Sequence, residues 1–309
     1  MNSLVRFRYA FAEDCEYNGS RQGRWPANIP MPTPIRLTSN IKVSRRLPTF
    51  LLLGALVFAT ACLAFAQSTP PPSLAIAAAS DLQFALPEIA AAYARSTGIS
   101  PQISYGSSGN LSAQIANGAP FDLLLSADAS YPRSLISHGK AVADSLTLYA
   151  RGCLVVWFGP GAAAGTPQLT VADLANPAFR HIAIANPRHA PYGRAAEAAL
   201  KSAGVYEAVA PRLVLGENIS QTAQFVESGN AEAGLVALSL LQASPSQHKG
   251  VWKFVPLDSY PPLDQAAVIT TRGARNPAAR SFIAFLNSPE ARKIFQRYGF
   301  QRPSTERAP

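Results

Sequence analysis

The sequence predicts an α/β fold whose sheets are covered by helices on both faces. Short apolar segments alternate with segments of helical periodicity from residue 74 to residue 300, a pattern typical of parallel or mixed sheets. Hydrophobic residues make up 48% of the chain, which is ample for a buried core, and charged residues only 15%. The 309 residues suit one large open sheet or two smaller lobes.

The expected elements follow one another in regular alternation. Residues 74–79 (LAIAAA) form an apolar run of strand length, and Leu82, Leu86 and Ile89 then recur at helical spacing. The predicted strands are 74–79, 101–106, 121–127, 154–159, 181–186, 212–216, 233–238 and 252–257. The predicted helices are 81–95, 111–117, 129–137, 191–203 and 220–229, followed by two helices within 276–300 that divide near Ser288-Pro289.

The first 66 residues differ from the rest and are interpreted as a leader that is removed. An "SRR" tripeptide precedes an apolar run, residues 47–66, which ends in "AFA". This order is typical of a secretory signal peptide, with cleavage after Ala66; a membrane-spanning helix is the weaker interpretation, because the run is barely long enough. Residues 67–73 would be a short linker, and the protein would be periplasmic. Met1 and Met31 both qualify as its start.

Removal of this leader changes the charge of the chain. It holds eight of the 27 Lys and Arg residues and three of the 18 Asp and Glu residues, so the formal net charge falls from +9 to +4. The sequence shows no cluster of basic residues that would mark a nucleic-acid surface. Cys153 is the one cysteine left and lies in an apolar run, which predicts a buried thiol and no internal disulfide.

Polar residues and glycines gather where the predicted strands meet their helices. The junctions are Ser80-Asp81, Ser107-Ser108-Gly109, Ala127-Asp128, residues 190–193 (APYG) and residues 217–220 (ENIS). Ser, Asp and Asn are common helix N-caps, and Ser80 with Gln83 has the spacing of a capping box, so each junction taken alone predicts a cap. In open α/β sheets, however, ligands bind beyond the carboxyl ends of the strands, which makes the whole set a candidate site.

The chemistry of these junctions suits a doubly charged oxyanion. Helix starts offer unpaired N–H groups and the positive end of a dipole. Gly106 and Gly109 allow close approach of the backbone, and the serine hydroxyls add donors. A fully deprotonated oxyanion has only acceptor atoms, whereas a protonated phosphate also needs an acceptor. Because an inward carboxylate would favour the phosphate, we expect Asp81 and Asp128 to turn away, into caps or solvent.

Four segments carry a resemblance to a known family. They are "AAASDLQFALPEIAAAY" (77–93), "SYGSSGNLSAQIANGAPFDLLLSAD" (104–128), "IANPRHAPYGRAAEAAL" (184–200) and "RYGF" (297–300). In this order and spacing they resemble the periplasmic molybdate-binding proteins of ABC importers, the ModA family, over nearly all of residues 74–301. The resemblance implies a two-lobed type II periplasmic-binding-protein fold, in which each lobe is a mixed sheet flanked by helices and the ligand lies in the cleft between them. Lobe 1 would comprise residues 74–151 and 265–309, and lobe 2 residues 152–264.

The same resemblance implies a set of ligand contacts. These are Ser80 through its hydroxyl and backbone, Ser108 through its hydroxyl, Ala127 and Ile219 through their backbone N–H groups, and Tyr192. Many members of the family place a tyrosine where this chain has Ala237, and Tyr192 would supply the missing hydroxyl. The alternative for Tyr192 is that its ring packs at the lobe interface with the hydroxyl in water.

The resemblance implies a binding protein and not an enzyme. The protein would capture molybdate, and tungstate as well, deliver it to a membrane permease driven by an ATPase, act as a monomer and need no cofactor. Sulfate or another tetrahedral oxyanion is the alternative ligand, and the pocket radius would discriminate. A distant alternative is an exported serine hydrolase with Ser107 or Ser108 as nucleophile, which needs a histidine within hydrogen-bond reach.

Other chemistry has weaker support in the sequence. The four histidines lack metal-binding spacing, and His189 is expected to be a solvated loop residue. The sequence contains no G-x-x-x-x-G-K-[ST] loop, so nucleotide hydrolysis must belong to a partner. Arg188 and Arg194 flank the "APYG" turn and are expected at the solvated surface.

Overall fold

The computed structural model describes residues 73–160, 162, 169–243 and 250–303. These residues belong to a compact unit that spans Gln67–Pro309. The leader, its cleavage after Ala66 and the choice between Met1 and Met31 lie outside the described residues. Among the helices that are described, none combines the length and the apolar character needed to cross a bilayer.

The first sheet is mixed and has five strands. In spatial order these are β2 (Pro101–Gly106), β1 (Leu74–Ala79), β3 (Leu123–Ser126), β10 (Leu263–Ile269) and β4 (Thr147–Gly152). Strands β1, β2 and β3 run parallel, whereas β10 is antiparallel to both β3 and β4. Parallel neighbours need crossover connections, and helices provide them here.

Alternation along β1 divides the core of this sheet into two halves. Ile76 and Ala78 point to one face and Ala77 to the other, because successive side chains of a strand alternate, and all three are buried. The first face packs against α2 (Ala85–Thr97), α9 (Pro277–Leu286) and α10 (Pro289–Arg297), and the second against α3 (Ser108–Ala116) and α4 (Ser130–Ser137). Helices therefore cover both faces, as predicted.

The second sheet repeats this plan with five other strands. In spatial order these are β7 (Leu213–Gly216), β6 (Ile182–Ala185), β8 (Ala233–Ala237), β5 (Leu154–Phe158) and β9 (Val251–Phe254). Strand β6 runs parallel to β7 and β8, and β5 is antiparallel to β8 and β9. The helices that follow its strands are α5 (Pro191–Ser202), α6 (Tyr206–Val209), α7 (Ile219–Glu227) and α8 (Leu238–Gln242). Trp157 of β5 is buried in this core.

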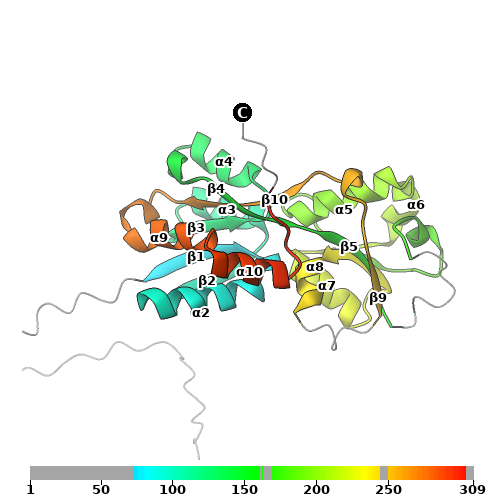
Figure 1. The fold of residues 1–309 in the computed structure, drawn as a ribbon. Coiled ribbons are helices and arrows are strands. Elements are labelled where there is room, and N and C mark those ends of the chain that lie inside the picture. The colour runs from blue at the N-terminus through cyan, green and yellow to red at the C-terminus, as the bar shows by residue number, and fades with distance from the viewer. Residues whose placement is uncertain (1–72, 161, 163–168, 244–249, 304–309) are drawn as a thin grey trace, which may run out of the picture. The chain divides into compact units, whose positions relative to one another are not determined.

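The chain passes between the two sheets twice. It leaves the first sheet at Gly152, enters the second at Leu154, and returns between β9 and β10. Figure 1 shows the two sheets with their helices side by side, and β10 where they meet. The predicted fold class, two lobes that are each a mixed sheet flanked by helices, is confirmed. Lobe 1 and lobe 2 denote the first and second sheet with their helices.

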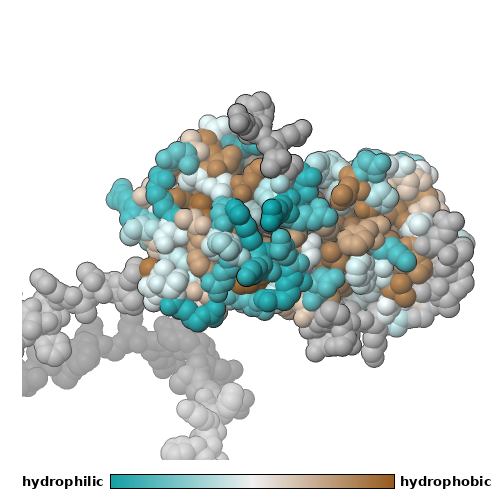
Figure 2. All heavy atoms as spheres, in the orientation of Figure 1, coloured by the Kyte–Doolittle hydropathy of each residue, from teal (hydrophilic) through white to brown (hydrophobic). Residues whose placement is uncertain are grey.

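Helix α10 gives one face of the molecule its polar character. Ala291 and Ile294 are buried, whereas Arg292, Lys293 and Arg297 are exposed. This spacing places apolar and charged residues on opposite sides of the helix. Figure 2 shows hydrophilic residues gathered over the middle of this face, where Figure 1 places α10.

Two helix starts differ from the prediction. The predicted helix 81–95 is a 3₁₀ turn, Ser80–Leu82, followed by α2, and the helix expected from Leu111 begins at Ser108. The division of the last two helices is confirmed, since the Oγ of Ser288 accepts a hydrogen bond from the N of Ala291 at 3.1 Å and caps α10.

Two strands are not foreseen from the sequence. Strand β4 carries Arg151, and β10 carries Asp264 and Gln265, so polar residues interrupt the apolar pattern of both. They pair with each other, and Arg151 and Asp264 form an ion pair of 2.7 Å across that pairing.

Candidate functional site

All five predicted contact residues line one cavity between the lobes. They are Ser80, Ser108 and Ala127 from lobe 1 and Tyr192 and Ile219 from lobe 2. Each follows the carboxyl end of a strand, namely β1, β2 and β3 in the first sheet and β6 and β7 in the second. The cavity volume is about 10 Å³, which is room for about one water molecule. A tetrahedral oxyanion can enter only if the lobes move apart, so this structure is a closed form.

Two predicted donors of lobe 1 are held against each other. Ser108 is the first residue of α3, and its Oγ accepts a hydrogen bond from the backbone N of Ala127 at 3.0 Å. Ser108 is buried, with 1% of its surface exposed. A hydroxyl that accepts one bond still has its own proton to donate. Ser108 therefore keeps a donor, and α3 adds the positive end of its dipole.

The glycine after these serines allows contact with the facing lobe. The backbone N of Gly109 donates to the backbone O of His189 at 2.9 Å. A Cβ at position 109 would lie 2.6 Å from that oxygen, which is too close for any other residue. The sequence predicts that the backbone at Gly109 comes close to a ligand; in this structure it comes close to the backbone of lobe 2 instead.

Ser80 joins the lobes instead of capping its own turn, so the predicted capping box is wrong. No side-chain bond caps the 3₁₀ turn. The Oγ of Ser80 accepts a long bond from the N of Ser220 at 3.4 Å, and the backbone O of Ser80 accepts one from the Oγ of Ser220 at 2.9 Å. Gln83, the other member of that box, accepts from the same Ser220 hydroxyl at 2.8 Å. Ser80 therefore lies against the start of α7, where Ile219 is the first residue.

Asp81 lines the cavity, which corrects the expectation that it turns away into a cap or solvent. Only 1% of its surface is exposed. Its Oδ2 accepts hydrogen bonds from the Nε2 of Gln265 at 2.6 Å and from the Tyr192 hydroxyl at 3.1 Å, and these donors from β10 and α5 hold it inward. Burial raises the pKa of the Asp81 carboxyl to about 6, against the opposing effect of the two bonds.

The hydroxyl of Tyr192 is not in water, so the alternative interpretation of this residue is wrong. Tyr192 is 2% exposed and donates to Asp81. Burial and the neighbouring carboxyl hold the pKa of Tyr192 well above its usual value, so the hydroxyl keeps its proton. A side chain at position 152 would overlap this hydroxyl, and Gly152 leaves room for it.

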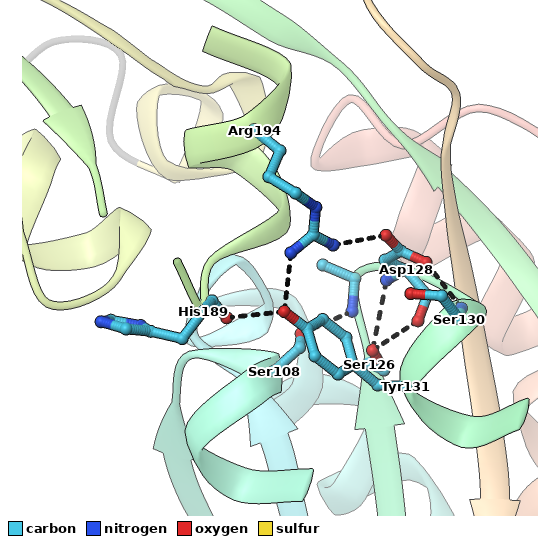
Figure 3. A network of polar contacts seen from close by, with 8 residues as sticks. Ser108, Ser126, Asp128, Ser130, Tyr131, His189 and Arg194 are labelled. Atoms are coloured by element: carbon cyan, nitrogen blue, oxygen red, sulfur yellow. Dashed lines mark hydrogen bonds and ion pairs between the residues drawn. The ribbon is translucent and has the colours of Figure 1, made fainter. Parts of the chain in front are cut away.

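A second carboxylate, Asp128, takes part in a polar contact between the lobes (Figure 3). Its Oδ1 accepts from the N of Ser130 at 2.6 Å, and its Oδ2 accepts from Arg194 of α5 at 2.6 Å. Arg194 also donates to the Tyr131 hydroxyl at 2.7 Å, and that hydroxyl donates to the backbone O of His189 at 3.2 Å. We call Asp128, Tyr131 and Arg194 the interlobe latch.

The latch confirms one expectation and corrects another. Asp128 turns toward the start of α4 and away from the cavity, as predicted. Arg194 is not a solvated surface residue, because its side chain is only 38% exposed and pairs with lobe 1. Arg188 is exposed, as predicted.

His189 is less solvated than the sequence predicts. Its side chain is 18% exposed, its Nδ1 lies 2.9 Å from the Oγ of Ser107, and its Nε2 lies 3.7 Å from a carboxylate oxygen of Glu217. Glu217 also accepts a hydrogen bond from Asn110. Ser107 and His189 stand 82 positions apart, and no local pattern marks their meeting. These residues add further contacts between the two lobes.

The remaining expectations concern metal, thiol and the family tyrosine. In the part of the chain that the structure describes, no group of three or more His, Cys, Asp or Glu side chains could hold a metal ion. Cys153 is buried, as predicted, and burial raises the pKa of its thiol. Ala237 is fully buried at the end of β8 and is not among the residues that line the cavity.

The fold and the cleft define a class of protein. Residues 74–301 match the family of bacterial extracellular solute-binding proteins, and this chain belongs to that family. Its relatives include the molybdate-binding protein ModA of Azotobacter vinelandii, 38% identical over 248 residues that cover 80% of this chain and 97% of the relative. The molybdate-binding protein ModA of Rhodobacter capsulatus is 40% identical over 214 residues, 69% of this chain and 82% of the relative.

A solved structure shows the same arrangement. The periplasmic molybdate-binding protein of A. vinelandii aligns with a TM-score of 0.69 at 34% identity, over 75% of this chain and 100% of that one. The resemblance found in the sequence is thus confirmed at the level of family and fold.

Proposed function

We propose that this protein captures molybdate, and tungstate as well, for import by an ABC transporter. The observation that carries the proposal is the convergence of five strand ends, from two sheets, on one cavity rich in uncharged donors. The molybdate-binding relatives support the ligand, since one of them matches over 97% of its length. Tungstate follows from chemistry, because it is an oxyanion of the same charge and nearly the same size.

Neutral donors hold a dianion only when several act together. Burial of an ion without hydrogen bonds is costly, whereas a hydrogen bond to a charged group contributes about 1.5–3 kcal/mol. The proposed contacts are the hydroxyls of Ser80 and Ser108, the backbone N–H groups of Ala127 and Ile219, and Tyr192. Such a set, less the costs of desolvation and closure, is compatible with sub-micromolar binding, which corresponds to roughly 8 kcal/mol or more.

Release and delivery need the lobes to move. We propose a hinge at the two connections between the sheets, β4 to β5 and β9 to β10, which opens the cleft and closes it around the anion. The closed protein would then dock on a permease driven by an ATPase. In this account the chain is exported by the signal peptide, cleaved after Ala66, and works in the periplasm as a monomer without a cofactor.

Calorimetric titration of the purified protein with molybdate, tungstate, sulfate and phosphate tests the ligand. We expect sub-micromolar dissociation constants for molybdate and tungstate. Sulfate is smaller and would leave donors out of reach, so it should bind at least about tenfold more weakly, a difference of 1.4 kcal/mol. Tighter binding of sulfate would transfer the proposal to that anion, and absence of heat with all four would reject it.

A serine hydrolase is the second candidate, favoured by the contact between Ser107 and His189 at 2.9 Å. One observation weighs against it. Glu217, which would have to orient the histidine, lies 3.7 Å from it with a side chain that is 61% exposed. We therefore propose binding and not catalysis. A fluorophosphonate probe should leave Ser107 unlabelled; labelling that disappears in Ser107→Ala would establish the hydrolase instead.

A further inference from the structure

A buried carboxyl oxygen in the cleft has no partner. The Oδ2 of Asp81 is held by Gln265 at 2.6 Å and Tyr192 at 3.1 Å, but Oδ1 is buried and accepts no hydrogen bond. It is the one such side-chain atom within the described residues. Buried polar atoms are nearly always satisfied, and Asp81 also lines the cavity where the dianion would lie. The carboxyl group of Asp81 therefore has one oxygen without a hydrogen bond beside the proposed ligand.

Within the described residues, no positively charged side chain contacts the Asp81 carboxyl. The titratable groups near it are the hydroxyls of Tyr149 on β4 and Tyr192 on α5, with Cys153 and Tyr260 close to Tyr192. Burial raises the pKa of all four, so each is neutral at neutral pH. The charge of Arg151 acts on Cys153 and Tyr260, but Arg151 is paired with Asp264 at 2.7 Å.

The helices packed against the Asp81 turn contribute only neutral groups. From α8, the hydroxyl of Ser239 donates to the backbone O of Asp81 at 2.8 Å. From α7, Ser220 contacts the backbone of Ser80. The cation of the latch, Arg194, is already paired with Asp128 at 2.6 Å. A dianion placed next to an ionised Asp81 would thus face uncompensated repulsion in a site with little water.

We propose that Asp81 takes up one proton when the oxyanion binds, so that the neutral carboxyl becomes an additional hydrogen-bond donor of the site. This inference rests on the proposed function. The proton comes from solvent, and no covalent bond other than the new O–H forms. On Oδ1 it donates directly to an anion oxygen; on Oδ2 it donates to the Tyr192 oxygen, and Tyr192 gives its own proton to the anion. Either route adds one donor to the site.

Proton uptake has a defined sign. In the closed form without an anion, burial raises the pKa of the Asp81 carboxyl to about 6, and a neighbouring dianion would raise it further, because it disfavours the charged form. Between these two pKa values the free protein is ionised and the complex is protonated. The affinity for the anion should therefore fall about tenfold for each pH unit above the pKa of Asp81 in the free protein, and it should be constant below that pKa.

Calorimetry with dilute molybdate in buffers of different ionisation enthalpy measures the protons bound directly. At about pH 7.5 we expect nearly one proton taken up per anion by the wild-type protein. Asp81→Asn, which is neutral at every pH, should bind without proton uptake and with a dissociation constant that hardly changes with pH. Asp144→Asn is the matched control: it also removes a carboxylate of lobe 1, but from an exposed pair with Arg280, and it should keep the wild-type proton uptake.

The outcomes separate this inference from the function beneath it. No heat with molybdate at any pH would reject the proposed function. Tight molybdate binding by the wild-type protein without proton uptake would reject the inference alone, and this holds even if Asp81→Asn fails to fold. Phosphate binding that exceeds molybdate binding and is lost in Asp81→Asn would also reject it, because Asp81 would then stay ionised and accept a proton of the ligand.

Discussion

The two lobes share a sheet plan, but their equivalent strand ends carry different chemistry. In each sheet the strand next to one edge, β1 or β6, lies between two parallel neighbours. The helix after the second strand begins with Ser108 in lobe 1 and with Ile219 in lobe 2. One position offers a hydroxyl and the dipole of its helix, whereas the other offers only its backbone N–H and the dipole. Lobe 1 is thus the richer source of side-chain donors.

The third strand end explains why lobe 2 contributes fewer contacts. In lobe 1, Ala127 follows β3 and lines the cavity. In lobe 2, the corresponding residue after β8 is Leu238, whose backbone N donates to the O of Cys153 at the crossing between the lobes. Leu238 is not among the residues that line the cavity. We therefore expect lobe 1 to provide most of the ligand contacts and lobe 2 to hold the cleft closed, through Tyr192 and Arg194.

The largest expected effect concerns Asp81. It follows β1 of lobe 1 and accepts a hydrogen bond from Tyr192, which follows β6 of lobe 2. A carboxyl whose pKa rises from 3.8 to about 6 on folding holds its proton more tightly in the folded state. The free energy of unfolding therefore falls as the pH rises between these values, by about 3 kcal/mol in all. Asp81→Asn removes this loss and can still accept from Gln265.

Urea unfolding of wild type and Asp81→Asn at two pH values checks this prediction. The two proteins should be similar at about pH 4, and the variant more stable by up to about 3 kcal/mol near pH 7.5. A difference that is the same at both pH values would show that Asp81 does not titrate in this range.

Gly109→Ala should separate closure from folding. The new Cβ overlaps the backbone of His189 in lobe 2, so the closed form is blocked, and we expect molybdate affinity to fall roughly a hundredfold, or 2.7 kcal/mol. Alanine is the better residue inside α3 by roughly 0.5–1 kcal/mol, so lobe 1 itself should not be destabilised. Calorimetry measures the molybdate affinity, and thermal unfolding measures the stability. Unchanged affinity would mean that the contact between Gly109 and His189 is not part of the liganded form.

Ser108→Ala against Ile219→Val tests the difference between the equivalent helix starts. Loss of the Ser108 hydroxyl removes a donor, so molybdate affinity should fall at least about tenfold, or 1.4 kcal/mol, with the fold intact. Ile219→Val keeps the backbone N–H and should change affinity far less. Ser112→Ala, on the same helix as Ser108 but away from the cavity, is the control. Equal losses at positions 108 and 219 would remove the distinction between the lobes.

Arg194→Gln gives the smallest of these effects. It breaks the ion pair with Asp128. The side chains of Arg194 and Asp128 are 38% and 28% exposed, and a partly exposed pair contributes about 1 kcal/mol at most. Because the pair joins the lobes, the loss should appear in ligand dissociation, by about fivefold, and should shrink at high salt. Stopped-flow measurements at low and high salt decide; a salt-independent change would point to lost packing instead.

The sequence predicts the parts of the site that depend on a single strand end. Ser108 and Ile219 begin helices directly after strands, and this local signal suffices to place them at one edge of a sheet. Contacts between residues far apart in the sequence leave no such signal. Within lobe 1, Gln265 meets Asp81 across 184 positions; between the lobes, Tyr192 meets Asp81 across 111 and Arg194 meets Asp128 across 66. The inward turn of Asp81 and the latch therefore emerge only in the folded protein. Strands β4 and β10 escape prediction because Arg151 and Gln265 interrupt their apolar runs.

A crystal structure of the protein grown with tungstate tests the central claim most directly, because the heavy atom marks its own position. The account predicts the anion between the lobes, with the hydroxyls of Ser80 and Ser108 and the backbone nitrogens of Ala127 and Ile219 each within about 3.2 Å of an oxygen. An anion bound elsewhere, or one held in this cleft by a lysine or arginine side chain, would contradict it.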